Sequence, residues 1–432
     1  MKLVSASLIL FLLAACVSKK PESIVKEQEV ERLIRTLSSD AMQGRATFTP
    51  GAEKAAAFIE NEFSKIGLLP LSSEKGYRQQ FLMSRIKPSA TEVIIDGNPV
   101  KEENVLVITD KAGINWNSDP GIEIIHIKKG ENLFSKYREI TAMNKEVLVY
   151  ADEQLKDSFK KLRDYINNGR VVDKPNKQAA VVFVTGVKEV NSFRVSFTNQ
   201  IEQLPLFNVA GMISGKSKSK EYVIFSAHYD HLGIISPVDG DSIANGADDD
   251  ASGVTAVISL ANYYKKINNN ERTLIFVAFT AEELGGFGSK YFSKRLKPED
   301  VVAMFNIEMI GKESKFGKNA AFITGYEKSD FGQILQRNLE GTGFTFHPDP
   351  YINENLFYRS DNATLAALGV PAHTISTDKI DSDKYYHTVN DEFETLDVKN
   401  IYATIKAISL SSRSIVNGMD TPQRIPKLEQ EE

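Results

Sequence analysis

The chain has 432 residues, enough for one large domain or two of ordinary size. Apolar residues make up 42% of it and charged residues 25%, which is the balance of a globular protein. The net charge is only −5 and there is no block of basic residues, so nucleic acid is excluded as an expected partner.

The first residues, MKLVSASLILFLLAAC, predict a signal peptide over residues 1–15, because the apolar stretch Leu3–Ala15 is too short to span a bilayer. Its end, LAAC, resembles the lipobox of bacterial lipoproteins. This implies cleavage before Cys16, lipidation of that thiol, and anchoring at the bacterial cell envelope, periplasmic or surface-facing. Residues 16–27 are then expected to be a polar tether. The alternative is an ordinary signal peptide with a chance cysteine. Cys16 is the only cysteine, so no intramolecular disulfide can form.

The next segments predict helices and then a change of character. Apolar residues recur at helical spacing over 24–37 and again over 52–66, where Gly67 is the expected C-terminal cap. Residues 87–204 instead contain short β-like runs with one helical piece near 155–166. This region is expected to be a smaller, inserted β-rich domain. Its strand pattern resembles the protease-associated domain.

Strands and helices alternate after residue 205. Apolar strands such as EYVIF and RTLIFVAF are each followed by a helical pattern. Continuous apolar strands between helices predict an α/β fold with a mixed, mostly parallel sheet and helices on both faces. Residues 28–86 and 205–420 are expected to form this domain, and residues 421–432 a polar tail.

Acidic and histidine side chains gather where these strands end. They are His228, Asp230, Asp249, Glu282, Glu283, Glu308 and His387. Taken singly, each has an ordinary explanation, such as a helix cap or a packed histidine. Parallel strands deliver their carboxyl ends to one edge of a sheet, however, and so much buried charge needs a positive partner there. Histidine and carboxylate together suit zinc.

The order HYD, GADDDASG, EE, NIEMIG, YHT resembles the co-catalytic zinc aminopeptidases, a family with relatives such as aminopeptidase Y and the glutamate carboxypeptidase type. The resemblance implies a zinc-exopeptidase fold and two zinc ions bridged by Asp249. One ion would be completed by His228 and Glu308, and the other by Glu283 and His387. Glu308 departs from the aspartate that is usual in the family, although related co-catalytic peptidases use either acid.

The resemblance also implies the reacting groups. Glu282 would be the general base that takes a proton from water and passes it to the leaving amine. Tyr386 could donate its hydroxyl to the oxyanion, or could simply pack at its loop. Asp230 would accept the second N–H of the His228 imidazole and so fix its tautomer.

The predicted function is that of a zinc-dependent exopeptidase, an aminopeptidase that hydrolyses N-terminal residues of peptides. Asp248 and Asp250 are candidates for holding the free α-amino group. Glutaminyl-peptide cyclisation and carboxypeptidase or dipeptidase activity are alternatives on the same fold. A surface lipoprotein that binds peptides without catalysis is an alternative from another class.

Other polar residues near the motifs are given supporting roles. His231 is expected to pack beside the site, and His373 to lie in the core. Ser360 and Asp361 are expected to brace the loop of His387.

Overall fold

The computed structural model describes residues 23–118, 121–167, 170–176 and 179–428. The chain divides into two compact units, of which unit 1 comprises Met1–Gln79 with Asn208–Glu432, and unit 2 comprises Gln80–Phe207. The predicted signal peptide and Cys16 lie outside the described residues, and the lipid anchor stays a prediction. Within the described ranges, no helix has the length and apolar character needed to cross a membrane.

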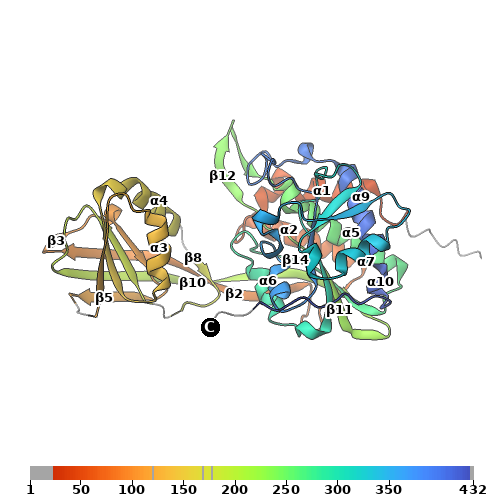
Figure 1. The fold of residues 1–432 in the computed structure, drawn as a ribbon, viewed down its shortest axis with the longest axis horizontal. Coiled ribbons are helices and arrows are strands. Elements are labelled where there is room, and N and C mark those ends of the chain that lie inside the picture. Colours follow the sequence, from red (N-terminus) through yellow and green to blue (C-terminus); the bar gives the residue numbers. More distant parts are fainter. Residues whose placement is uncertain (1–22, 119–120, 168–169, 177–178, 429–432) are drawn as a thin grey trace, which may run out of the picture. The chain divides into compact units, whose positions relative to one another are not determined.

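Unit 1 is an α/β structure (Figure 1). Its helices are α1 (Glu27–Leu37), α2 (Pro50–Ile66), α5 (Gly253–Ile267), α6 (Phe287–Ser293), α7 (Phe331–Arg337), α8 (Ala363–Ala367), α9 (Val398–Ser411) and α10 (Arg413–Val416). Its strands are β1 (Leu69–Pro70), β11 (Lys218–His228), β12 (Gly233–Val238), β13 (Asp241–Ala244), β14 (Arg272–Phe279), β15 (Val301–Ile307), β16 (Ala320–Ile323), β17 (Thr345–Pro348) and β18 (Ala372–Ser376).

The centre of the unit 1 sheet is parallel. The strands lie in the order β17-β16-β18-β15-β11-β14-β10, where β10 is Phe193–Ile213, and β14, β11, β15 and β18 all run in one direction. The chain leaves β11 to form β14 on one side and then crosses to form β15 on the other. The carboxyl end of β11 is therefore a topological switch point, where α/β sheets present their ligand sites.

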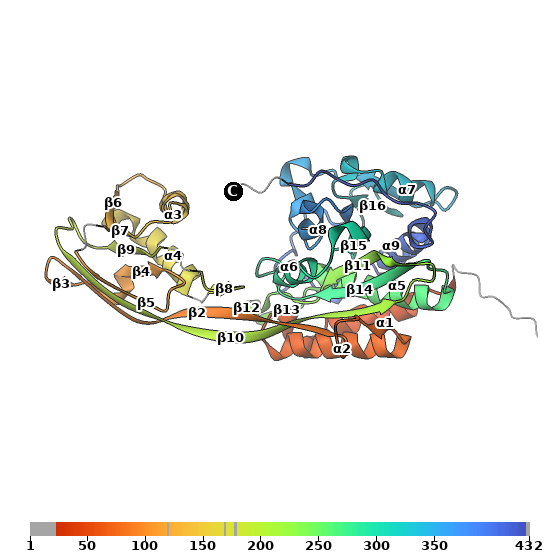
Figure 2. The same ribbon diagram turned by 90° about the horizontal axis from the view of Figure 1, so that it is seen from below.

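Helices cover both faces of this sheet (Figure 2). On one face Phe225 of β11 packs against Tyr264 of α5, with ring centroids 5.5 Å apart. On the other, Ile224 shares a buried cluster with Phe292 of α6 and Leu365 of α8. All eight residues of β14 are buried, as continuous apolar strands require in a doubly covered sheet. The predicted fold class is confirmed.

One local prediction for unit 1 is wrong. The stretch EELGGFGSKYFSKRL predicts a helix from Glu282, but the helix begins at Phe287, because Gly285 and Gly286 have positive φ angles that end the turn carrying the glutamate pair. Helices α9 and α10 follow one another with Ser412 between them. Among the residues that the structure describes, β12 and β13 pair with each other alone and form a hairpin with Gly233 opposite Ala244.

Unit 2 has a four-stranded sheet and buried cores of its own. Two long strands, β2 (Arg78–Ile95) and β10 (Phe193–Ile213), lead the chain out of unit 1 and back. The other elements are β3 (Asn98–Pro99), β4 (Val105–Ile108), β5 (Gly113–Asn117), β6 (Glu123–Ile127), α3 (Leu133–Ala142), β7 (Val147–Ala151), α4 (Lys156–Asn167), β8 (Arg170–Val172) and β9 (Val181–Thr185). The sequence reading missed α3, whose cap is the Asn132 side chain accepting the Ser135 N–H at 3.0 Å.

Both ends of the described chain pack on unit 1. Ile24 and Val25, at the end of the predicted tether, are buried. Ile425, inside the predicted polar tail, is buried in the same cluster as Ile224, and its N–H donates to the Gly369 carbonyl. These segments are therefore parts of the folded unit.

We expect His373 of β18 to give unit 1 a characteristic acid sensitivity. Its Nδ1–H donates to the Thr324 carbonyl and its Nε2 accepts from Ser329, each at 2.8 Å, and burial lowers its pKa to about 4. Below pH 6.5 the His373 imidazole binds a proton in the unfolded chain but stays neutral in the folded chain. Stability from this group should therefore fall as the pH drops from 6.5 to 4, by roughly 3 kcal/mol in total.

The measurement is urea unfolding of metal-free protein between about pH 7 and pH 4. His373→Phe, beside the stacked ring of Phe331, should flatten this slope, while His126→Phe in unit 2 serves as the control and should keep it. An unchanged slope in the His373 variant would contradict the assignment.

Candidate metal centre

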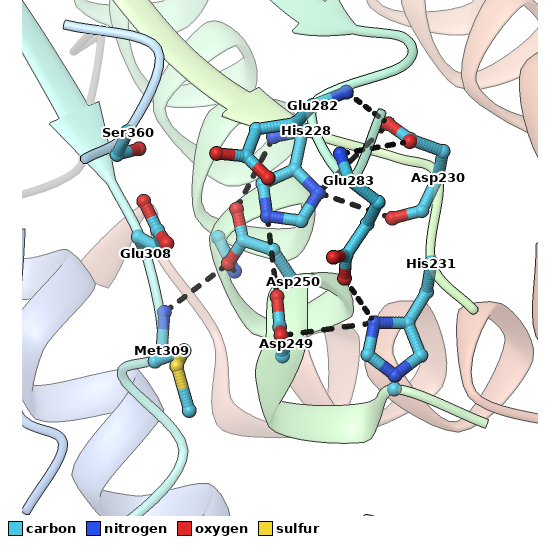
Figure 3. Close-up of polar contacts among 12 residues, drawn as sticks. His228, Asp230, His231, Asp249, Asp250, Glu282, Glu283, Glu308, Met309 and Ser360 are labelled. Atoms are coloured by element: carbon cyan, nitrogen blue, oxygen red, sulfur yellow. Dashed lines mark hydrogen bonds and ion pairs between the residues drawn. The ribbon is translucent and has the colours of Figure 1, made fainter. Parts of the chain in front are cut away.

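The predicted site residues meet at the switch point of the unit 1 sheet, and Figure 3 shows His228, Asp249, Glu282, Glu283 and Glu308 among them. His228 is the last residue of β11, and Glu308 follows β15 directly. The pair Glu282 and Glu283 lies in the turn after β14. Asp249 lies in the tight turn Ala247–Ser252 that leads into α5, and His387 lies in the loop after β18.

Asp249 lies between two imidazoles. One carboxylate oxygen is 3.2 Å from His228 Nε2, and the other is 3.2 Å from His387 Nε2. His387 Nε2 is also 3.3 Å from a Glu283 oxygen. Zinc bonds of about 2.0–2.1 Å place neighbouring tetrahedral ligands roughly 3.3 Å apart, so these separations suit ligands of shared ions.

The polar atoms at this point lack partners of their own. His228 Nε2 and Glu283 Oε1 are buried and make no hydrogen bond to any described residue. Burial raises the pKa of Asp249, but the nearby imidazoles of His228, His231 and His387 outweigh it and hold that pKa well below its usual value. The donor set is thus an ionised carboxylate among unsatisfied imidazole and carboxylate atoms, which fits divalent metal.

Glu282, Glu308 and Tyr386 line one pocket together with Asp249 and His387. Burial raises the pKa of Glu282 well above its usual value, and the neighbouring carboxylate of Glu308 adds to the shift. The Tyr386 ring stacks on His387 with centroids 3.9 Å apart, and burial raises the pKa of its hydroxyl.

Asp230 holds the glutamate turn rather than the histidine. Its carboxylate accepts the backbone N–H groups of Glu282 at 3.1 Å and Glu283 at 3.4 Å, and the Thr47 hydroxyl at 3.0 Å. His228 Nδ1 lies 3.0 Å from the Asp230 backbone carbonyl, but 3.9 Å from its carboxylate. The expected tautomer-fixing contact is therefore made by the main chain.

Asp250 fastens neighbouring segments in the same way. It accepts the backbone N–H groups of His228 at 3.2 Å, Gly253 at 3.0 Å and Met309 at 3.2 Å. Its carboxylate is buried and occupied by these donors. The suggested contact of Asp250 with a substrate amine is not supported by this arrangement.

Asp248 belongs to a separate acidic group with Asp378 and Asp383. Lys312 Nζ lies 2.5 Å from Asp383, 3.4 Å from Asp248 and 3.8 Å from Asp391, so this group has a cation from within the chain. Asp248 also accepts the Gly311 N–H at 2.6 Å and is fully buried. It too is a structural carboxylate rather than an amine contact.

Two charged residues form hydrogen bonds with the loop of Asp249. Neither was predicted from the sequence. Arg45 is fully buried and donates to the carbonyls of Tyr229 at 2.8 Å, Asn245 at 2.5 Å and Gly246 at 2.8 Å. Its remaining donors reach the carbonyls of Leu37 and Asp249.

Asp391 takes the amides of the same loop, accepting from the N–H groups of Asp248 and Asp249 at 3.0–3.1 Å. Because Asp391 follows His387 by four residues, it ties the loop of that histidine to the loop of Asp249.

The remaining predictions divide. His373 lies in the core, as described above. Ser360 accepts from Asn306 at 2.7 Å and lines the pocket together with Glu308, whereas Asp361 is buried and does not line it. His231 does more than pack beside the site, because its Nδ1 is 2.9 Å from Glu283 Oε1 and 3.7 Å from Asp249.

Two known proteins are similar to this chain in sequence. The aminopeptidase YwaD of Bacillus subtilis is 22% identical over 424 residues, which cover 90% of this chain and 85% of that protein. A probable zinc metalloprotease of Pyrenophora teres f. teres is 27% identical over 217 residues, 48% of this chain and 44% of that protein.

Two solved structures align over both units' residue ranges. The aminopeptidase from Aneurinibacillus sp. strain AM-1 has a TM-score of 0.55 at 18% identity, covering 95% of this chain and 97% of its own. BSAP, a zinc aminopeptidase from Bacillus subtilis, has a TM-score of 0.55 at 17% identity, covering 92% and 97%. At these identities the likeness concerns the fold.

A family model matches residues 208–411, the range that holds every predicted metal ligand. The model is that of peptidase family M28, and the relatives above include aminopeptidases. The resemblance expected from the motifs is confirmed for this part of the chain: residues 208–411 match peptidase family M28.

Proposed function

We propose that the protein is an aminopeptidase that uses two zinc ions to remove N-terminal residues from peptides. The observation that carries this is the position of Asp249, whose two oxygens each face a different imidazole. A single carboxylate in that position suits a bridge between two ions. Aminopeptidases of the same fold support the choice of substrate end.

The ligands divide between two positions. One ion would be held by His228, Asp249 and Glu308, and the other by Asp249, Glu283 and His387. When bound, two zinc ions polarise a substrate carbonyl and lower the pKa of water. Buried hydrogen bonds hold the backbone N–H groups of His228, of Asp249 and of Met309, the residue after Glu308, which keeps these ligands in place before metal arrives.

Glu282 moves the proton. It borders the same pocket as Asp249, and its raised pKa favours acceptance of a proton from the attacking water and delivery to the leaving amine. The hydroxyl of Tyr386 keeps its proton because burial raises its pKa, so it can donate a hydrogen bond to the oxyanion.

The pocket wall selects the N-terminal side chain. Met309, Phe322, Leu356 and Ile380 give this wall apolar surface next to Glu308. Transfer of an apolar side chain from water to such a wall is favourable. A substrate carboxylate would instead be repelled by the acidic residues of the site. Leucine-like residues are therefore the preferred substrates of this proposal.

The test is hydrolysis of aminoacyl-nitroanilides by the purified chain, with metal content measured on the same sample. We expect about two zinc ions per chain, turnover of leucyl over aspartyl substrate, and a loss of ~100-fold or more after chelation that zinc reverses. N-acetylated substrates are the matched control and should not react.

Other outcomes would redirect the proposal. Turnover of N-blocked peptides with a free carboxyl end would indicate a carboxypeptidase. Full metal with release of ammonia from N-terminal glutamine would indicate cyclisation. A chain that binds no zinc under any of these conditions would contradict the metal centre itself.

A further inference from the structure

His231 occupies the metal centre although no part of the expected ligand set includes it. It lies three residues past the end of β11, in the turn before the β12–β13 hairpin. Its side chain is buried, with 2% of the residue exposed. Figure 3 shows its imidazole directed at Glu283 and Asp249, with Nδ1 at 2.9 Å and 3.7 Å from their oxygens.

The imidazole of His231 has no hydrogen bond. Neither ring nitrogen makes one to a described residue, and neither does the facing oxygen Glu283 Oε1. The approach of 2.9 Å is short enough for a hydrogen bond, yet the N–H direction does not meet the oxygen. His228 Nε2 has the same combination of burial, a close Asp249 oxygen and no hydrogen bond.

Burying the unpartnered polar atoms of His231 and Glu283 costs free energy unless a ligand contacts them. Two buried nitrogens and a buried carboxylate oxygen without partners each lose the hydrogen bonds that water gave them. Ligand atoms of His231, Asp249 and Glu283 all lie within 4.8 Å of one another, close enough to surround one ion. A cation among the three satisfies them together.

The ring is also held in place by a built cradle. Gly246 has a left-handed φ of 55°, and a Cβ there would come within 2.5 Å of the His231 ring. The backbone N–H of His231 donates to the Arg45 carbonyl at 3.3 Å, while the Arg45 guanidinium holds the Gly246 carbonyl at 2.8 Å. Only glycine at 246 leaves room for an imidazole with this orientation.

We propose that His231 Nδ1 is an additional ligand of the metal that Glu283 holds. This inference rests on the zinc centre of the proposed function. Glu283 would present one oxygen toward buried His231 and the other toward His387, which is 37% exposed. The metal pair would then be served by three imidazoles, one more than the sequence motifs indicate.

The experiment compares His231→Ala, His231→Gln and His228→Ala in the full chain, with His126→Ala in unit 2 as the matched control. Each is loaded with Co²⁺ for its visible absorption spectrum and titrated with Zn²⁺ against a chelator for affinity. Thermal unfolding of the metal-free proteins establishes that each variant folds.

We expect His231→Ala to weaken the affinity for one of the two ions by more than ~100-fold, above the loss typical of an outer-shell change, and to alter the Co²⁺ spectrum. Added free imidazole should restore the spectrum of the alanine variant by filling the vacated position. The control should match the parent chain in both measurements.

The possible outcomes distinguish a failure of the His231 proposal from a failure of the proposed metal centre. If His228→Ala loses an ion while both His231 variants keep the parent affinity and spectrum, His231 is no ligand. If affinity falls but the spectrum keeps its form and imidazole does nothing, His231 only orients Glu283, which also overturns the proposal. If neither His228→Ala nor the His231 variants change metal binding, the centre itself is wrong.

Discussion

Replacing Glu282 by glutamine is expected to lower kcat for peptide substrates by about 10³-fold, because the amide cannot accept the proton of the attacking water. Glutamine has nearly the same shape, and the backbone N–H that Asp230 holds at 3.1 Å is untouched. Zinc content should therefore stay at the parent level. Steady-state kinetics and metal analysis on one preparation provide the measurement.

Two further variants make the result specific. Glu283→Gln, one residue on, should lose metal along with activity, because its carboxylate faces His231 and His387. Glu327→Gln removes an exposed carboxylate elsewhere in unit 1 and should leave both unchanged. If Glu282→Gln kept activity within a few fold, the proton would have another acceptor and the assigned base would be wrong.

Replacing Arg45 by methionine is expected to lower the unfolding free energy of unit 1 by about 4–6 kcal/mol, because several buried carbonyls lose a charged donor at once. Methionine fills similar space, so the loss reflects polar contacts more than a cavity. Arg45→Lys keeps the charge but reaches fewer carbonyls, so its unfolding free energy should lie between those of the parent chain and Arg45→Met. Urea unfolding of the metal-free chain, followed by circular dichroism, measures the effect.

The single tryptophan gives this experiment an internal reference. Trp116 lies in a buried cluster of unit 2, so its fluorescence should report that unit's unfolding and stay at the parent midpoint. Arg424→Met is the matched control, since exposed Arg424 makes one hydrogen bond to the Val301 carbonyl. A loss under 1 kcal/mol in Arg45→Met would contradict the proposed grip on the Asp249 loop.

The closeness of the candidate site residues could be predicted because most of them follow strands. The candidate ligands His228, Glu283 and Glu308 and the candidate base Glu282 come after apolar runs whose period and length predict a parallel sheet. A parallel sheet gathers its carboxyl ends, so placement in the sequence already implies closeness in space. The shared edge of β14, β11 and β15 bears this out.

The supports of the site could not be predicted, because nothing in their local sequence marks them. Arg45 lies in a loop and acts on carbonyls about 200 residues away, a relation that no periodicity records. Asp391 looks like an ordinary turn acid in TVNDE. The one usable signal was a second histidine in HYDH, where His231 follows Asp230 directly.

The prediction of local structure was wrong where a glycine or a helix cap, and not the apolar pattern, decided where a helix forms. Gly285 and Gly286 shift the start of α6, and this leaves Glu282 and Glu283 in a turn whose N–H groups Asp230 can reach. In unit 2, α3 has a weak apolar stripe and depends on its Asn132 cap. Both cases put tertiary or capping contacts above intrinsic pattern.

The β12–β13 hairpin has a consequence for recognising distant relatives. It closes on itself between Gly233 and Ala244, while Arg45 separately fixes the carbonyls of Tyr229 and Asn245 on its two sides. Residues gained or lost at its tip, near Gly240, would change the sequence distance from His231 to Asp249 without moving either side chain. A search pattern for such chains should leave that interval free and weight the two segments that flank it.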